Sequence, residues 1–463
     1  MSTALDEVIT TAQLVPLSQA VEVNPKIDRT ALHDDLDVSF VPMAAVEALS
    51  GGIDVSTVRK YGDVKKGYTH FRDGDILFAK VTPCMENGKM AIARKLVNGV
   101  GFGSTEFHVL RPRAGVDARY VYYFVSSQTF RKDASGHMTG AVGLRRVPSA
   151  YLEEQSVLLP DIEQQREIVS ELEKQFSRLD EAVANLLRVK ANLKRYKASV
   201  LKDAVEGRLV PTEAELARRE GRRFETGEQL LQRILEKRRD QWSRSGAYKT
   251  PLNRSNEKPG ELPEGWVWST YEQLGRMQLG RQRSPKYHNG PNMRPYLRVQ
   301  NVFEDRIDLS DVMEMEFNAS DFEKYQLATG DLLLNEGQSP ELLGRPAIYR
   351  GELPGACFTN TLIRFRAAEG VSVEFALHLS RHYMLAGRFV DEGTITTNIA
   401  HLSLGRLATV EFPLPPFAEQ KRIVEEVERR LSLVRSVQTE VDANLKRAQA
   451  LRQSVLSKSF VSP

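Results

Sequence analysis

The sequence predicts an α+β fold in which two globular units alternate with two long helices, and the second half of the chain repeats the first. Three observations predict this. The helix opening LPDIEQQREIV at Leu159 recurs as LPPFAEQKRIV at Leu414, an offset of 414 − 159 = 255 residues. Shorter similarities recur at nearly the same offset along most of the chain. Apolar residues follow each opening at heptad spacing, which is typical of a coiled coil.

The order of the segments follows from this repeat. We expect a globular unit at 1–158, a long helix at 159–207, a basic helical segment with a flexible linker at 208–261, a second globular unit at 262–413 and a second long helix at 414–463. The linker is indicated by the polar, Pro- and Gly-rich run SRSGAYKTPLNRSNEKPGELPEG.

Each globular unit is predicted to be mixed α+β. Gly74 in RDGDILF and Gly330 in ATGDLLL differ by 330 − 74 = 256 positions, so these strand-like runs belong to the repeat. Turn residues separate short β-prone runs. Those runs are DILFAKV, AIARKLV, EFHVLRP, DLLLNE and TLIRFRA. One helical patch is expected per unit, at ARYVYYFVSSQTFRK and at VEFALHLSRHYMLAG.

The two long helices are predicted to pair with each other as an antiparallel coiled coil. Polar residues interrupt the two apolar seams at different places: Lys190 is equivalent to Leu445, and Gln438 to Val183. This difference favours pairing of the helices with each other over self-pairing. The alternative is two amphipathic helices, each on its own domain. An antiparallel pair would give the repeat a pseudo-twofold axis, as a DNA-reading dimer has.

The composition indicates the net charge of the protein and its expected cellular location. The chain carries 64 basic and 61 acidic residues, a net charge of +3, so any DNA-binding surface must come from local sorting of charge. Two cysteines without metal-site spacing and no signal or membrane-spanning stretch lead us to expect a cytoplasmic protein.

Together these motifs resemble the specificity subunit of a type I DNA restriction–modification system. The resemblance rests on the two helix openings, the helix ending SVLKDAVEGRLVP, the domain entry LPEGWVW and the alternation of units with helices, and it covers essentially the whole chain. It implies that the units are target-recognition domains that read a bipartite, gapped sequence in double-stranded DNA, one half-site each. The second helix departs from the pattern, since it ends SVLSKSFVSP without an EGRLVP continuation.

The resemblance also implies partners and cofactors. The paired helices would hold two methyltransferase (modification) subunits, and motor-nuclease (restriction) subunits would join them. The chain itself would be a non-catalytic subunit without a cofactor or metal. S-adenosylmethionine, ATP and Mg would belong to the partner subunits. Two alternatives stay open: a coiled-coil scaffold without DNA contact, or the specificity factor of a methylation-only or other phage-defence complex.

Candidate DNA contacts are polar and basic residues in loops beside the repeated strands, because such side chains read base edges and hold phosphates. In the first unit they are Lys80, Thr82, Asn87, Lys89, Ser104, Thr105, Arg145 and Arg146. In the second they are Arg281, Gln282, Arg283, Lys286, Asn335, Gln338, Ser339, Arg345, Asn360, Thr396, Thr397, Asn398 and His401. Each is also compatible with a solvated loop position.

The first turns of both long helices are the candidate partner surface. Its residues are Gln164, Gln165, Arg166, Glu419, Gln420 and Lys421. Helix capping and solvation are the alternative for each of them.

The sequence offers weak support for an enzyme. An amino-methyltransferase needs Asn or Asp before Pro-Pro-aromatic, but Leu414 stands there and has no polar atom to bind the target amine. The run GVGFGST lacks the context of a dinucleotide loop, and no GxxxxGK[ST] or HExxH motif occurs.

Overall fold

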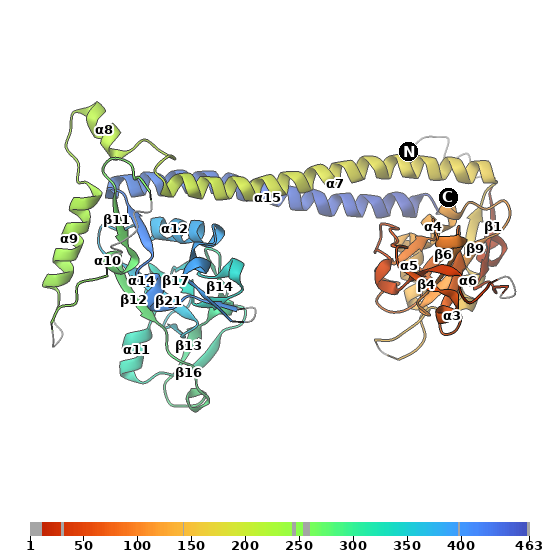
Figure 1. Ribbon diagram of the computed structural model, residues 1–463, viewed down its shortest axis with the longest axis horizontal. Helices are drawn as coiled ribbons and strands as arrows, with labels where there is room; N and C mark the ends of the chain where they lie inside the picture. The colour runs from red at the N-terminus through yellow and green to blue at the C-terminus, as the bar shows by residue number, and fades with distance from the viewer. Residues whose placement is uncertain are drawn as a thin grey trace. The chain divides into compact units, whose positions relative to one another are not determined.

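The computed structural model describes residues 12–28, 32–141, 143–242, 247–252, 260–396 and 399–460. The chain forms two compact units (Figure 1). Unit 1 comprises Met1–Arg188 and Val441–Pro463, and unit 2 comprises Val189–Glu440. Each unit combines a mixed α+β body with parts of the two long helices, which confirms the predicted fold class.

Unit 1 is built on a four-stranded antiparallel sheet of order β2-β9-β6-β7. The strands are β2 (Val21–Val23), β9 (Phe107–Pro112), β6 (Ile76–Ala79) and β7 (Met90–Ile92). The predicted strand DILFAKV supplies β6, whose side chains are all buried. Two helices, α4 (Ala118–Ser126) and α5 (Gln128–Gly136), pack on this sheet through Tyr120, Phe124 and Phe130.

A second sheet in unit 1 has the order β4-β3-β8-β5 and contains one parallel pair, β3 with β8. Its strands are β4 (Val58–Lys60), β3 (Asp37–Val41), β8 (Val100–Gly103) and β5 (Thr69–Arg72). A separate antiparallel pair, β1 (Gln13–Pro16) with β10 (Ser156–Leu159), leads into the first long helix. The short helices are α2 (Leu17–Ala20), α3 (Tyr61–Val64), α6 (Ser149–Glu154), η1 (Met43–Ala45) and η2 (Val97–Gly99).

Unit 2 repeats this plan. Its main sheet, β12-β21-β17-β19, is antiparallel and consists of β12 (Gly275–Leu279), β21 (Leu362–Ala367), β17 (Asp331–Asn335) and β19 (Pro346–Tyr349). The second sheet, β16-β13-β20, again has one parallel pair, between β13 (Met293–Leu297) and β20 (Cys357–Phe358), with β16 (Met313–Glu316) at its edge. The pair β11 (Val267–Thr270) and β24 (Glu411–Leu414) precedes the second long helix.

Smaller elements complete unit 2. Helix α12 (Val373–Leu385) packs on β17 and β19 as α4 packs on the sheet of unit 1. Two further sheets are the hairpin β14 (Val302–Phe303) with β15 (Arg306–Ile307), and β18 (Gly337–Gln338) with β23 (Ile399–His401) and β22 (Thr394–Thr396). The remaining helices are α10 (Tyr271–Leu274), α11 (Ala319–Tyr325), α13 (Arg388–Glu392), α14 (Leu404–Ala408), η3 (Pro285–Tyr287), η4 (Val299–Asn301) and η5 (Pro340–Leu342).

The long helices α7 (Ile162–Val205) and α15 (Phe417–Lys458) pair in opposite directions. In unit 1, Leu456 near the end of α15 packs with Leu172 and Phe176 near the start of α7. In unit 2, Val200 and Leu201 near the end of α7 share a core with residues of the first turns of α15, including Ile423, Val427 and Leu431. These contacts confirm the predicted antiparallel coiled coil.

The basic segment after α7 forms two helices in unit 2, α8 (Glu213–Glu220) and α9 (Gly227–Asp240). Each begins with a reciprocal capping box, Thr212 with Glu215 and Thr226 with Gln229, which is a strong helix-start signal in the sequence. Of the predicted linker, residues 243–246 and 253–259 lie outside the described part of the chain.

The predicted helical patch ARYVYYFVSSQTFRK is not one helix. Ser127 has extended backbone angles, φ −62° and ψ 147°, and its hydroxyl accepts a hydrogen bond from the Phe130 N–H to cap α5. A serine that can cap a new helix ends the first one here. The counterpart in unit 2 runs unbroken to Leu385.

Candidate nucleic-acid interface

Three predicted loops converge at one end of the main sheet of unit 1. The Lys80 N–H donates to the Glu106 carbonyl at 2.9 Å, and the Val147 N–H donates to the Lys80 carbonyl at 2.9 Å. Val81 and Arg146 form an isolated antiparallel bridge. The loop after β6, the turn between β8 and β9, and the loop before α6 therefore share one backbone framework, and they bring the candidate residues of unit 1 together.

Ion pairs hold the basic side chains of this cluster. The Arg146 guanidinium binds Glu106 through two hydrogen bonds of 2.9 and 2.6 Å, and Arg145 lies 3.9 Å from the carboxylate of Glu86. The hydrogen bonds from Arg146 hold the pKa of Glu106 below its usual value. Lys80, whose backbone joins the three loops, has a half-buried side chain. Arg146 uses its Nε and Nη2 for Glu106, so the donors of its Nη1 stay available for phosphate or base oxygens.

Of the other candidates of unit 1, three side chains form hydrogen bonds with backbone groups and two are exposed. Thr82 Oγ1 donates to the Arg145 carbonyl at 3.3 Å, and Lys89 Nζ donates to the Met43 carbonyl at 3.1 Å. Ser104 Oγ accepts from the Glu106 N–H at 3.2 Å. Asn87 and Thr105 are exposed. DNA contact by these residues stays a prediction.

Unit 2 repeats the framework bond for bond. The Glu336 N–H donates to the Thr361 carbonyl at 3.0 Å, the Leu402 N–H donates to the Glu336 carbonyl at 2.7 Å, and Gly337 pairs with His401. These positions are the counterparts, at offset 255 or 256, of the three contacts in unit 1. The framework is therefore shared, whereas its side chains differ: Lys80 corresponds to Glu336, Thr82 to Gln338, and Arg146 to His401.

Three candidates of unit 2 lie inside the unit. Arg281 is buried, pairs with Asp321 at 2.8 Å, donates to the Glu316 carbonyl and lies over the Tyr287 ring. Arg345 is buried over the Phe303 ring. Asn335 is fully buried at the end of β17. Contact with a base would require these side chains to move out of the interior of the unit. In the structure they are packed inside it and do not face solvent.

The remaining candidates of unit 2 lie nearer the surface. Gln282, Arg283 and Lys286 are exposed; Gln338, Ser339, Asn360 and His401 are half-buried. His401 Nδ1 lies 3.4 Å from the Glu336 carboxylate. Thr396 lies on β22, and the predicted contacts Thr397 and Asn398 lie outside the described residues.

Three cations of unit 2 lie over or near aromatic rings, and one of them was missed in the sequence. Lys286 lies over Tyr287, Arg283 near Tyr296, and Arg294 over Phe322, at 4.7, 5.7 and 4.6 Å from the ring centroids. No carboxylate pairs with Arg283, Lys286 or Arg294 among the described residues. Alternation of Arg with aromatic residues in NMRPYLRV was the available signal for Arg294.

The corresponding sheet of unit 1 has one such cation: Arg59 on β4 is exposed, lies 3.7 Å from the Phe40 ring centroid and forms no ion pair with a described residue. Lys60 pairs with Asp37 at 2.8 Å, and Lys65 pairs with Asp34 at 2.7 Å. These two lysines are therefore neutralised by neighbouring aspartates. Unpaired cations attract phosphate more strongly than paired ones, so Arg283, Lys286 and Arg294 should attract a polyanion more strongly than Lys60 and Lys65 do.

The helix openings contain an anchor that is present twice. Gln165 is buried; its Oε1 accepts from the Asp117 N–H at 2.9 Å, and its Nε2 donates to the carbonyls of Pro160 and Gly115 at 2.8 and 3.3 Å. Gln420 makes the same three bonds to Ser372, Pro415 and Gly370, at 2.8, 3.0 and 3.3 Å. Both amides are thus used within their own unit.

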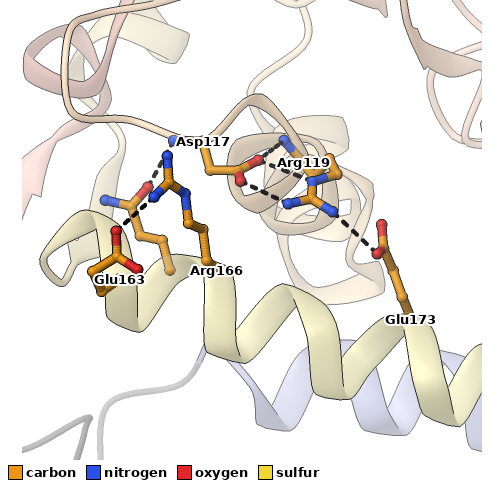
Figure 2. A network of polar contacts seen from close by, with 6 residues as sticks. Asp117, Arg119, Glu163, Arg166 and Glu173 are labelled. Carbon is orange, nitrogen blue, oxygen red and sulfur yellow. Dashed lines mark hydrogen bonds and ion pairs between the residues drawn. The ribbon is translucent and has the colours of Figure 1, made fainter.

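The surroundings of the first anchor form a charged network (Figure 2). Asp117, the N-cap of α4, binds Arg119, and Arg119 reaches Glu173 on α7 at 3.2 Å. Arg166, next to the anchor in the chain, pairs with Glu163 at 2.5 Å and is exposed. Gln164 is half-buried and Lys421 is exposed. For these residues a partner contact stays a prediction.

Glu419 is fully buried and has an internal role. Its carboxylate accepts from the Glu213 N–H at 2.7 Å and from Trp266 Nε1 at 2.8 Å, so it fastens α8 and the entry of the second globular unit to α15. Burial raises the pKa of Glu419. Glu213 in turn pairs with Arg222 and Arg422, each at 2.6 Å. No sequence pattern indicates this junction, because its members lie far apart in the chain.

Both long helices also present apolar side chains to solvent. Leu433 and Val437, one turn apart on α15, are 58% and 43% exposed. Contiguous apolar patches that are exposed to solvent mark protein-binding surfaces, and these two residues are the candidates for one on α15. The described part of the chain contains no helix long and apolar enough to cross a membrane. Among the same residues no group of His, Cys, Asp or Glu is arranged to hold a metal ion.

The comparisons with known proteins agree with this architecture. Residues 13–188 match the family model described as the type I restriction modification DNA specificity domain. The EcoAI type I restriction enzyme specificity subunit of Escherichia coli is 29% identical, over 89% of this chain and 76% of that protein. The EcoEI specificity subunit, also from Escherichia coli, is 25% identical over the same shares.

A solved structure shares the fold of most of the chain. It comes from a study of complex assembly and conformational transition of a type I R-M system. Its TM-score is 0.65, and the superposition covers 96% of this chain and 97% of that one at 18% sequence identity.

Proposed function

Because this chain belongs to the family of type I restriction–modification specificity subunits, we propose that it reads a bipartite, gapped target in double-stranded DNA. Each globular unit serves as a target-recognition domain for one half-site. The helix pair sets the gap between the half-sites and holds two methyltransferase subunits, which motor-nuclease subunits join.

The duplicated loop framework carries this proposal. The same three backbone contacts recur in both units, yet the side chains they present are Lys80, Thr82 and Arg146 in one and Glu336, Gln338 and His401 in the other. Base edges are distinguished by the donors and acceptors that face them, so a common frame with different side chains suits two different half-sites. Identical loops would suit a palindrome.

Scaffolding is supported by the helices. Their buried faces join each recognition domain to the coiled coil, whereas Leu433 and Val437 stay exposed on α15. The chain's own task in this proposal is binding. It is a non-catalytic subunit, and S-adenosylmethionine, ATP and Mg act in the partner subunits.

Co-expression with the cognate methyltransferase subunit tests the proposal. Single-molecule sequencing of the host DNA would map methylated adenines. We expect one motif of two short, different halves around a gap of fixed length. A contiguous motif would contradict the proposal. If a stable complex leaves the DNA unmethylated, a salt-dependent binding assay decides whether the chain binds DNA at all.

Two alternatives predict other outcomes. A scaffold without DNA contact would bind its partners but show no sequence-dependent DNA affinity. A methylation-only or other defence complex would give the split motif without cleavage of unmodified DNA, so restriction of unmethylated phage DNA separates it from a complete restriction system.

A further inference from the structure

A cavity of about 460 Å³ lies in unit 2 between the end of α7, the middle of α15, α12 and the β14–β15 turn. Four cations from these four elements line it: Lys197, Arg306, Arg381 and Arg435. None of them belongs to the candidate DNA loops. The cavity is therefore a feature separate from the recognition site described above.

The positive charge around this cavity exceeds its local compensation. Glu304 accepts from Lys197 Nζ at 2.6 Å and from Arg381 Nε at 2.9 Å. Arg345, which is also buried, lies close enough to Glu304 for electrostatic attraction but forms no ion pair with any described residue. One carboxylate thus serves the buried Arg345 and Arg381 and the half-buried Lys197. The Nη1 atom of Arg381 is buried and has no hydrogen-bond partner among the described residues.

The other acids of the cavity are already engaged. Asp305 pairs with Arg350 at 2.8 Å, and Glu428 pairs with Arg435 at 3.2 Å. They do not offset the surplus beside Glu304. A buried cation without a matching charge is unfavourable, and a bound anion would remove that cost.

The repeat shows that the lining of the cavity differs from the equivalent positions of unit 1. At offset 255, Lys197 corresponds to Arg452, Leu431 to Phe176, and Val434 to Leu179. In unit 1, Arg452 lies 4.4 Å from the Phe176 ring centroid and pairs with Asp180 at 2.6 Å. The buried Phe176 is larger than its counterpart Leu431, and an aspartate on the facing helix neutralises the cation. In unit 2 the side chains at positions 431 and 434 are smaller, and Arg435, which pairs with Glu428, stands where Asp180 would neutralise Lys197.

We propose that this cavity binds an oxyanion of the phosphate class through Lys197 and Arg381. Guanidinium and ammonium groups together suit phosphate oxygens, because the former donates in a fork and the latter as a point charge. The volume accommodates a phosphate group with part of an attached ester. The anion is a free phosphate or phosphomonoester, or a phosphate of a nucleic-acid backbone, and the experiment separates these sources. The proposal does not depend on the proposed function.

Thermal unfolding of the full chain in inorganic phosphate tests it. At ten times the dissociation constant we expect the Tm to rise by about 3 to 6 °C over sodium chloride of equal ionic strength. Lys197→Met and Arg381→Met should abolish the rise. Arg452→Met, which removes the corresponding cation of unit 1, should retain it. Equal responses to phosphate and chloride in the unaltered chain would overturn the proposal.

Filling the cavity provides a second test that keeps every cation. Leu431→Phe with Val434→Leu introduces the residues of unit 1, and the phosphate-dependent rise should disappear. If that variant does not fold, isothermal titration of Lys197→Met with phosphate tests the site instead. The Lys197 side chain is half-buried, so its replacement should not disturb the core. If Lys197→Met still bound phosphate, the proposed anion site would be contradicted.

A duplex-binding assay then identifies the source of the anion. If Lys197→Met also weakens DNA binding, and phosphate competes with DNA only in the unaltered chain, the anion is a backbone phosphate. If DNA affinity is unchanged while phosphate binding disappears, it is a free phosphate compound. Both results support an oxyanion site. If Lys197→Met binds phosphate and DNA as well as the unaltered chain does, the proposal is rejected.

Discussion

Gln165 and Gln420, 255 positions apart, make the same three hydrogen bonds in the two halves of the chain. Each accepts from the backbone N–H of a helix N-cap, Asp117 or Ser372, and donates to two backbone carbonyls. A buried amide that satisfies three backbone groups fixes the first turn of a long helix against its recognition domain. The pattern LPxxxxQ(R/K)xIV, shared by the two helix openings, is thus repeated because its glutamine forms this joint.

The first prediction concerns this joint. Gln165→Leu keeps the volume but leaves three buried backbone groups without a partner, so unfolding of unit 1 should become about 1–3 kcal/mol easier. Hydrogen exchange should accelerate at Asp117 and stay unchanged at Ser372; Gln420→Leu should give the reverse. Gln165→Glu is the matched control, because it keeps the acceptor for Asp117. Equal exchange at both sites would contradict an independent role of each anchor.

An ion pair between an arginine and a buried aspartate is repeated in the main sheets and gives the second prediction. Arg111 binds Asp75 through hydrogen bonds of 2.8 and 2.7 Å, and Arg366 binds Asp331 in the same way at 2.6 and 2.8 Å. Asp75→Asn should destabilise unit 1 by about 3–5 kcal/mol, because it leaves the Arg111 charge buried without its partner. Urea denaturation measures this. A destabilisation below about 1 kcal/mol would show that the pair is replaceable.

The third prediction concerns the unpaired cations of unit 2. Replacing Arg283, Lys286 and Arg294 by glutamine should weaken binding to unrelated duplexes and lower the slope of log K against log salt by roughly 0.9 for each phosphate that the variant no longer neutralises. The matched control replaces Lys60 and Lys65 of unit 1, which are paired with aspartates, and should change the slope much less. Fluorescence anisotropy over a range of salt concentrations provides both values. If both variants changed the salt slope equally, Arg283, Lys286 and Arg294 would have no special part in DNA attraction.

His108 gives a prediction for pH. It is buried on β9, and its Nε2 lies 2.8 Å from the Val147 carbonyl in the loop that carries Arg145 and Arg146. Burial lowers the pKa of His108. The unfolded chain then binds a proton near pH 6.5 that the folded chain does not, so stability is complete above that pH and falls as the pH drops below it.

Thermal unfolding between pH 7.5 and 5 would measure the effect of His108. His108→Gln, which retains a polar side chain without titrating, should flatten this part of the profile. An unchanged profile would assign the acid sensitivity to other groups.

Partner binding gives the last prediction. Leu433→Gln with Val437→Gln should reduce capture of the methyltransferase subunit in a pull-down, because exposed apolar side chains contribute most when a partner buries them. Folding should be unaffected. Leu385→Gln, an exposed apolar position on α12 rather than on a long helix, is the control. Normal capture by the double variant would place the partner elsewhere.

Much of the fold could be predicted from the sequence. The repeat, both long helices and strands such as β6, β17 and β21 are governed by local patterns of apolar and turn residues. The break at Ser127 was missed because a serine between apolar residues is also compatible with a continuous helix. The junction at Glu419 depends on contacts with Glu213 and Trp266, which no local pattern reveals.

The candidate site could be predicted at the level of loops but less well for single residues. The loops converge as their equivalent offsets suggest, since a duplicated backbone repeats its contacts. Gln165 and Gln420 look like surface residues in the sequence, yet backbone groups of other segments bury them. Arg281 likewise looks like a loop cation, but Asp321 and Tyr287 hold it inside. Side-chain partners distant in sequence decide such cases.

The central claim is that each globular unit reads one half of a split target. The most direct test replaces residues 13–158 with the recognition domain of a relative of different specificity and maps methylated adenines with the same methyltransferase subunit. We expect one half of the motif to change while the other half and the gap stay the same. A change in both halves, or in neither, would contradict the claim.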